Sequence, residues 1–192
     1  HILSLPNHLI ASAILPHVSS DRVAAFLASC KTAWSLNSVR LQADWLLQRF
    51  SPVEALYRAA KPPFGSEALL LELIDGRGVN VLSELKGCPQ LVFQVSQAGW
   101  AGALEQMLES GMDPDGDGSQ YTPLMVAAAH GHVQVVALLL EAGADPECSD
   151  FDGLTPLHMA TMWGHIDHKE HAHVVRLLVK AGAPVNAQDV GG

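Results

Sequence analysis

Two segments of this 192-residue chain repeat each other at a distance of 33 residues, and this period is the strongest constraint on the fold. Residues 122–132 read TPLMVAAAHGH and residues 155–165 read TPLHMATMWGH. An apolar pattern with helical spacing follows each segment, at 135–140 and at 174–179, and each pattern ends at Gly-Ala. A glycine just past a helix end adopts the left-handed conformation without steric cost. The sequence therefore predicts stacked helical pairs that shield one another's apolar sides.

The shared Thr-Pro-Leu, Gly-His, Val-Val and Gly-Ala positions resemble the ankyrin repeat. This resemblance implies an all-α ankyrin-repeat solenoid, built of helix-turn-helix pairs with short β-hairpin fingers. A weaker copy lies at 99–113, and an eroded copy without the Thr-Pro-Leu-His turn lies at 51–80. We therefore expect an array over residues 51–192 of about four units, the first two degenerate. A further unit begins at Asp189, and we expect it to be cut off at the C-terminus.

The resemblance also implies where a partner protein binds. In ankyrin proteins, partners usually lie in the concave groove formed by the fingers and the first helix of each repeat. Exposed aromatic and methionine side chains are enriched at such surfaces. The matching positions are Gln120, Tyr121, Val126, His130, Phe151, Leu154, Met159, Met162 and Trp163. The alternative is that Met159, Met162 and Trp163 only pack against a following repeat or a nearby loop.

Residues 1–50 carry apolar side chains at intervals of three and four and predict two or three short helices. The segment resembles the F-box, which docks onto the Skp adaptor of cullin–RING ubiquitin ligases. Leu5-Pro6 matches the Leu-Pro opening of that motif, and Cys30-Lys31 with Trp34 matches its ending. The implied adaptor-binding residues are Leu5, Pro6, Leu9, Ile14, Leu15, Val18, Phe26 and Leu27.

Two functions are open at this point. With an F-box-like helical module at 1–50, the chain is a substrate-receptor subunit of an SCF-type ligase, and the array captures the target protein. If the N-terminal helices are only a cap, the chain is an ankyrin scaffold or assembly subunit without a ubiquitin-ligase role. Neither function places catalysis or a cofactor on this chain.

Residues 165–173 (HIDHKEHAH) hold four histidines. Eight residues separate Gly-His from Val-Val here, against two in the regular copy, so six residues are inserted. Inside a helix, six residues would rotate the apolar stripe by about 240°. We therefore expect a loop between the paired helices, with His165 in the Gly-His position. A metal site and a pH sensor are the alternatives, but no cysteine is nearby and H-E-x-x-H is absent.

Composition excludes several other classes of function. The formal net charge is −9 and no stretch gathers Lys and Arg, which disfavours nucleic acid and anionic lipid as partners. Three widely spaced cysteines indicate a reducing compartment, hence the cytoplasm or the nucleus. Residues 113–118 copy the first half of a calcium loop, but Leu124 stands where the bidentate Glu is required. The sequence contains no nucleophile–base spacing of the kind that indicates an enzyme.

Overall fold

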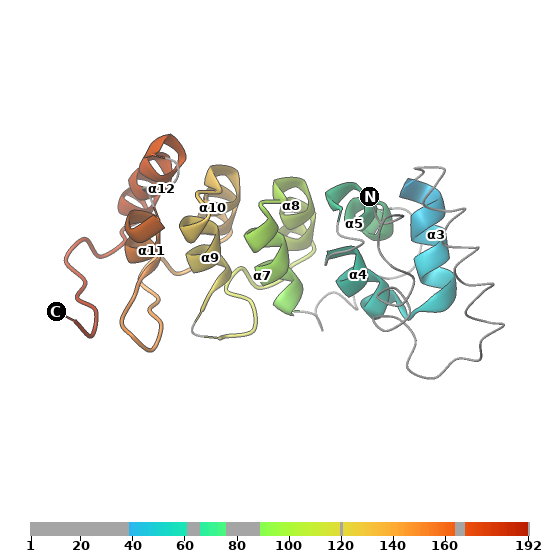
Figure 1. Ribbon diagram of the computed structural model, residues 1–192, viewed down its shortest axis with the longest axis horizontal. Coiled ribbons are helices and arrows are strands. Elements are labelled where there is room, and N and C mark those ends of the chain that lie inside the picture. Colours follow the sequence, from blue (N-terminus) through green and yellow to red (C-terminus); the bar gives the residue numbers. More distant parts are fainter. Residues whose placement is uncertain (1–38, 61–65, 76–88, 120, 164–167, 192) are drawn as a thin grey trace, which may run out of the picture. The chain divides into compact units, whose positions relative to one another are not determined.

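The computed structural model describes residues 39–60, 66–75, 89–119, 121–163 and 168–191 (Figure 1). Nine helices and no strand are assigned within these ranges. The chain divides into two compact units after Leu73. The predicted adaptor-binding residues and the predicted F-box-like module up to residue 38 lie outside the described residues, and so does Gln120.

The first unit contains α3 (Val39–Arg49), α4 (Pro52–Ala60) and most of α5 (Glu67–Asp75). Ser51 caps α4, because its Oγ accepts the backbone N–H of Glu54 at 3.3 Å. Arg58 forms an ion pair with Glu54 at 2.8 Å, and its guanidinium lies 4.1 Å from the centroid of the Phe50 ring. Leucines fill the interior of this unit and are at most 1% exposed: Leu46, Leu56, Leu69, Leu70 and Leu73.

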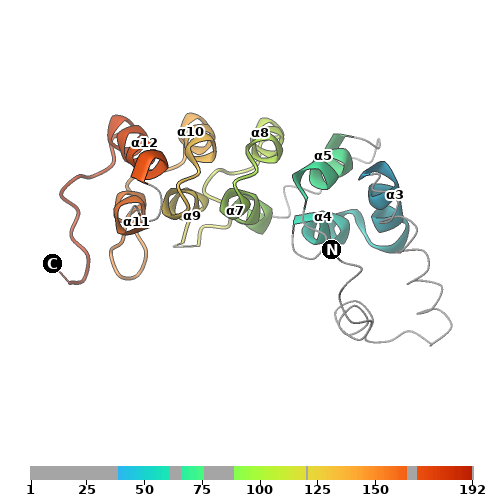
Figure 2. The same ribbon diagram turned by 45° about the horizontal axis from the view of Figure 1, so that its top comes forward.

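The second unit consists of three helical pairs. In each pair the first, inner helix packs against the inner helix of the neighbouring pair, and the second, outer helix packs against the neighbouring outer helix. Figure 2 shows the inner helices in one row and the outer helices in the other. The pairs are α7 (Pro89–Ala98) with α8 (Ala101–Glu109), α9 (Pro123–Ala129) with α10 (Val133–Glu141), and α11 (Pro156–Trp163) with α12 (His168–Lys180).

The repeated Thr-Pro-Leu segment begins both α9 and α11. Thr122 caps α9 by accepting the backbone N–H of Met125 at 3.3 Å, and a proline follows at the first helical position. In the second copy, Thr155 Oγ1 lies 3.0 Å from His158 Nδ1. The outer helices α10 and α12 end two residues before Gly143 and Gly182, whose φ angles of 94° and 97° confirm the predicted helix stops. The repeated segments thus set where α9 and α11 begin and where α10 and α12 end.

The expected loop in the histidine cluster is partly wrong. The helix α12 ends in register with α10, because Lys180 and Glu141 are 39 residues apart, which is the period plus the insertion. It nevertheless has 13 residues against 9, so the additional residues lie at its N-terminus. Three of the four histidines are therefore helical. Residues that lengthen a helix at its N-terminus do not rotate those that follow, so the apolar stripe keeps its direction.

The expected hairpin fingers are loops made of turns within the described residues. The first finger loop, residues 111–119 with Tyr121, precedes α9, and the second finger loop, residues 142–154, precedes α11. In the second loop the backbone N–H of Asp150 donates to the carbonyl of Leu154 at 3.1 Å. Turns and side-chain hydrogen bonds hold the rest of the loop, and no strand is assigned in it.

No helix in the described part of the chain is both long and apolar enough to cross a membrane.

Candidate partner-binding surface

Histidines connect successive helical pairs of the second unit. His132, at the start of α10, donates from Nε2 to the carbonyl of Gln97 at 3.1 Å. His171, within α12, donates from Nε2 to the carbonyl of Ala129 at the same distance. A Cβ on Gly99 would lie 2.7 Å from the His132 ring. The inner helices α7 and α9 are thus each followed by a glycine, Gly99 or Gly131, that leaves room for the imidazole of the next pair.

His171, rather than the expected His165, makes the contact that belongs to the Gly-His position. A Cβ on Gly131 would lie 2.8 Å from the His171 ring, which matches the close approach of a Cβ on Gly99 to the His132 ring. Both contacting histidines stand three residues before Val-Val, at 132 and 171. This spacing is visible in the sequence, and it would have identified His171. Counting forward from Gly164 instead selected the wrong histidine, because the insertion lies between that glycine and the contact.

Carboxylates stabilise both finger loops. Asp113 Oδ1 accepts the backbone N–H of Asp115 at 3.0 Å, and Asp117 Oδ1 accepts that of Ser119 at 3.0 Å. In the second finger loop, Asp150 Oδ1 accepts the N–H of Leu154 at 2.9 Å. These aspartates form side-chain turns, so residues 113–118, which copy the first half of a calcium loop in sequence, are part of a finger loop. Among the described residues, no group of three or more His, Cys, Asp or Glu side chains is placed to hold a metal ion.

The two finger loops are joined to each other. The backbone N–H of Asp145 donates to Asp115 Oδ1 at 3.2 Å. Burial raises the pKa of the Asp115 carboxyl, and the negative charges of Asp113 and Asp145 raise it further against the lowering effect of that hydrogen bond. Beyond α12, the N–H of Val190 donates to the carbonyl of Asp152 at 2.9 Å. The loops therefore form a connected row that concentrates negative charge.

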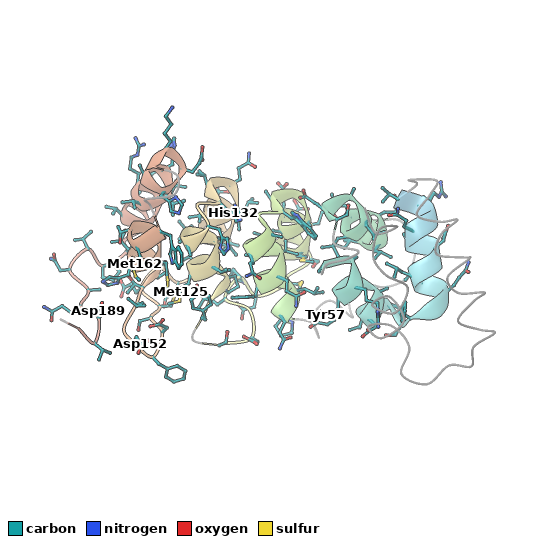
Figure 3. The ribbon with its side chains drawn as sticks, viewed as in Figure 1. Tyr57, Met125, His132, Asp152, Met162 and Asp189 are labelled. Carbon is teal, nitrogen blue, oxygen red and sulfur yellow. The ribbon has the colours of Figure 1, made fainter. Side chains whose placement is uncertain are left out.

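Four large apolar side chains are exposed on the inner helices and finger loops, and we call them the exposed apolar set. Phe151 in the second finger loop is 87% exposed, Met162 is 55% and Trp163 is 46%. Tyr121 is 38% exposed, and its ring centroid lies 5.9 Å from that of Phe93. Figure 3 shows Met162 on α11 and Asp152 in the loop that precedes this helix. All four side chains belong to the row of inner helices and their loops.

The remaining predicted partner-binding residues are placed differently. Val126 and Met159 are only 2% and 5% exposed, so the structure places them in the interior and not on a surface open to a partner. Leu154 is half-buried. His130 is exposed, its Nδ1 donates to the carbonyl of Val126 at 2.9 Å, and its ring stacks on that of His132. Fewer side chains of the inner helices are therefore open to a partner than the sequence positions indicated.

This chain belongs to the ankyrin-repeat family. The family model described as "Ankyrin repeats (3 copies)" matches residues 56–150 and 93–189, which together cover more than half of the chain. The match agrees with the three stacked helical pairs of the second unit and with their repeated caps and glycines.

Three curated relatives illustrate this membership. Protein phosphatase 1 regulatory subunit 12A of Mus musculus is 54% identical over 43 residues, which are 22% of this chain and 4% of that protein. Ankyrin repeat-containing protein P1E11.10 of Schizosaccharomyces pombe is 35% identical over 75 residues, 38% of this chain and 33% of the relative. NF-kappa-B inhibitor alpha of Sus scrofa is 33% identical across 36% of this chain and 33% of its own length. The chain thus spans a third or less of these relatives.

Proposed function

We propose that this chain binds another protein through the exposed apolar set, Tyr121, Phe151, Met162 and Trp163. The observation that carries the proposal is that these are the aromatic and methionine side chains found exposed among the described residues, whereas the other exposed large apolar residues are valines. Large aromatic and thioether side chains supply much of the binding energy when a partner covers them. Ankyrin repeats are protein–protein interaction modules, so the proposal concerns which surface is used. It assigns no catalysis to this chain.

A finer proposal concerns the role of that interaction. We propose that the chain is the substrate receptor of a cullin–RING ubiquitin ligase in the cytoplasm or nucleus. In this proposal residues 1–50 bind a Skp-type adaptor and the second unit captures the target. The support is the F-box resemblance of Leu5-Pro6 and Cys30-Lys31 with Trp34. The alternative is a scaffold or assembly subunit. Two relatives are named for proteins that they regulate or inhibit, protein phosphatase 1 and NF-kappa-B.

The binding surface is tested with the Phe151→Ala/Trp163→Ala double variant. The full chain is immobilised, binders are selected from a displayed library of random peptides, and their affinities for the variants are compared. Loss of two exposed aromatic anchors should weaken binding by about 10-fold or more. The control is Val179→Ala on the outer helix α12, where the shortened side chain is 45% exposed, close to the 46% of Trp163. Equal affinities for all three chains would contradict the proposal.

The receptor role is tested separately, by mixing the full chain with a recombinant Skp-type adaptor. Size-exclusion chromatography should show a complex, and Leu5→Asp/Ile14→Asp should abolish it while leaving the repeats folded by circular dichroism. A wild-type chain that elutes apart from the adaptor would refute the receptor role and favour the scaffold, whatever the outcome for the second unit.

A further inference from the structure

We infer that the segment bound by the exposed apolar set is basic, with Lys or Arg residues beside an apolar anchor. The inference rests on the proposed function and specifies the partner's chemistry. It combines two properties of one surface: the apolar side chains that need covering, and the sign of the charge around them.

The charge around the exposed apolar set is of one sign. From residue 87 to residue 168 the chain contains eleven Asp and Glu residues and no Lys or Arg. The basic residues of the described second unit all lie on the outer helix α12, at Lys169, Arg176 and Lys180. The two finger loops alone carry seven carboxylates: Asp113, Asp115, Asp117, Asp145, Glu147, Asp150 and Asp152. A partner that covers the apolar side chains therefore contacts loops whose charged side chains are all negative.

The apolar and acidic groups lie together. Phe151 has Asp150 and Asp152 as its neighbours in the chain. Tyr121 belongs to the first finger loop, yet its hydroxyl has a pKa raised by burial and, to a smaller extent, by the negative charge of Asp150 in the second loop. An aromatic ring next to a carboxylate suits a guanidinium or ammonium group, which contacts the ring face and the anion at once. Such pairs favour a cationic side chain over a neutral one.

The loop carboxylates can accept further hydrogen bonds from a partner, although they already accept backbone N–H groups of the loops. The hydrogen bonds inside the loops are made by Oδ1 of Asp113, Asp117, Asp145 and Asp150. An ionised carboxylate offers about four lone-pair sites on two oxygens, so a second donor can be accommodated. In addition, Asp113 and Asp145 repel the charge of Asp115, and a cation from a partner relieves this repulsion. The surface is therefore complementary to a basic segment.

The test compares two triple variants with equal changes of net charge. Asp117→Asn/Glu147→Gln/Asp152→Asn neutralises three exposed carboxylates in the finger loops, and the amides retain a side-chain oxygen for the turns. The matched control, Glu105→Gln/Glu109→Gln/Glu141→Gln, neutralises three exposed carboxylates on the outer helices α8 and α10. Peptides selected on the wild-type full chain are sequenced, and their affinities are measured by fluorescence anisotropy at low and high salt.

Selected peptides should be enriched in Lys and Arg next to an apolar residue. Their affinity should fall by about 10-fold in the finger-loop variant and by less than about 2-fold in the control, and salt should weaken binding to the wild type. Equal losses in both variants, or binding of neutral peptides that still depends on Phe151 and Trp163, would overturn the inference and leave the proposed function standing. Concentration-dependent dimers that only the finger-loop variant abolishes would also overturn it, in favour of a second copy as the occupant. Selection of no peptide that depends on Phe151 or Trp163 would overturn both.

Discussion

The middle and last helical pairs of the second unit have nearly the same sequence pattern and different surroundings. In α9, Leu124 and Ala128 are fully buried, whereas their counterparts in α11 are half-buried Leu157 and exposed Thr161. The middle pair packs against a pair on each side, and the last pair packs against one neighbour within the described residues. The same motif therefore contributes different amounts of stability according to its neighbours. This dependence is expected when most of the apolar contact is made between repeats.

The largest expected effect is a difference in unfolding free energy between alanine variants of the two equivalent leucines in the repeated Thr-Pro-Leu segment. Leu124→Ala should lower the free energy of unfolding by about 3 kcal/mol, because it leaves a cavity between packed helices. Leu157→Ala should lower it by about 1 kcal/mol, because this side chain is already partly in water. Urea unfolding followed by circular dichroism measures both values. Equal losses would show that the two pairs are equally enclosed.

The next effect compares two glycines that both have positive φ. At Gly182 a Cβ would meet no atom within 4 Å, so alanine there should cost about 1 kcal/mol from backbone strain alone. At Gly131 the Cβ would also press on the His171 ring at 2.8 Å, and the cost should be roughly twice as large. The midpoints of thermal unfolding should be displaced in the same order. A larger displacement for Gly182→Ala would contradict the glycine–histidine contact.

A smaller effect depends on pH and on the histidine of the middle pair. Burial lowers the pKa of His132 below 6.5, against the hydrogen bond to the Gln97 carbonyl, and the neighbouring His130 and His171 lower it further. The unfolded chain thus takes up the proton first, so stability is fully present above pH 6.5 and decreases as the pH falls from there toward the folded-state pKa. Urea midpoints measured across this interval should vary less with pH in His132→Gln. An unchanged pH dependence would remove His132 as its source.

The smallest effect concerns the exposed apolar set. The Tyr121→Ala/Trp163→Ala variant should unfold within a few degrees of the wild type, because both side chains keep substantial contact with water. Differential scanning calorimetry measures this difference. A displacement as large as that of Leu124→Ala would identify these aromatics as part of the core and would extend the enclosed region into the last pair.

The sequence predicted those features that depend on short stretches of chain. The period of 33 and the helix stops at Gly143 and Gly182 follow from short stretches of sequence, and the structure confirms them. The ankyrin family model confirms the fold class. The burial of Val126 and Met159 could not be derived in this way, because it depends on how closely neighbouring helices pack. The limits of an F-box-like module at 1–50 and of an array at 51–192 stay predictions, whereas the contacts divide the chain after Leu73.

The histidine cluster shows why insertions are difficult to place from spacing alone. Counting forward from the glycine and counting backward from Val-Val give different histidines, and packing decides between them. In the structure the backward count holds, because His171 contacts the backbone of the preceding pair through Ala129. The sequence contained the needed signal, but only the contact shows which end of the insertion is fixed.

The position of His171 has a consequence for how the last pair can change in evolution. The contact of this imidazole fixes the register of α12 against the preceding pair, whereas the turn of helix before it adds length without changing that register. Segments of other sizes are therefore expected to be accepted ahead of this point. Positions in the rest of the repeat are therefore counted from this histidine and not from the glycine before the insertion.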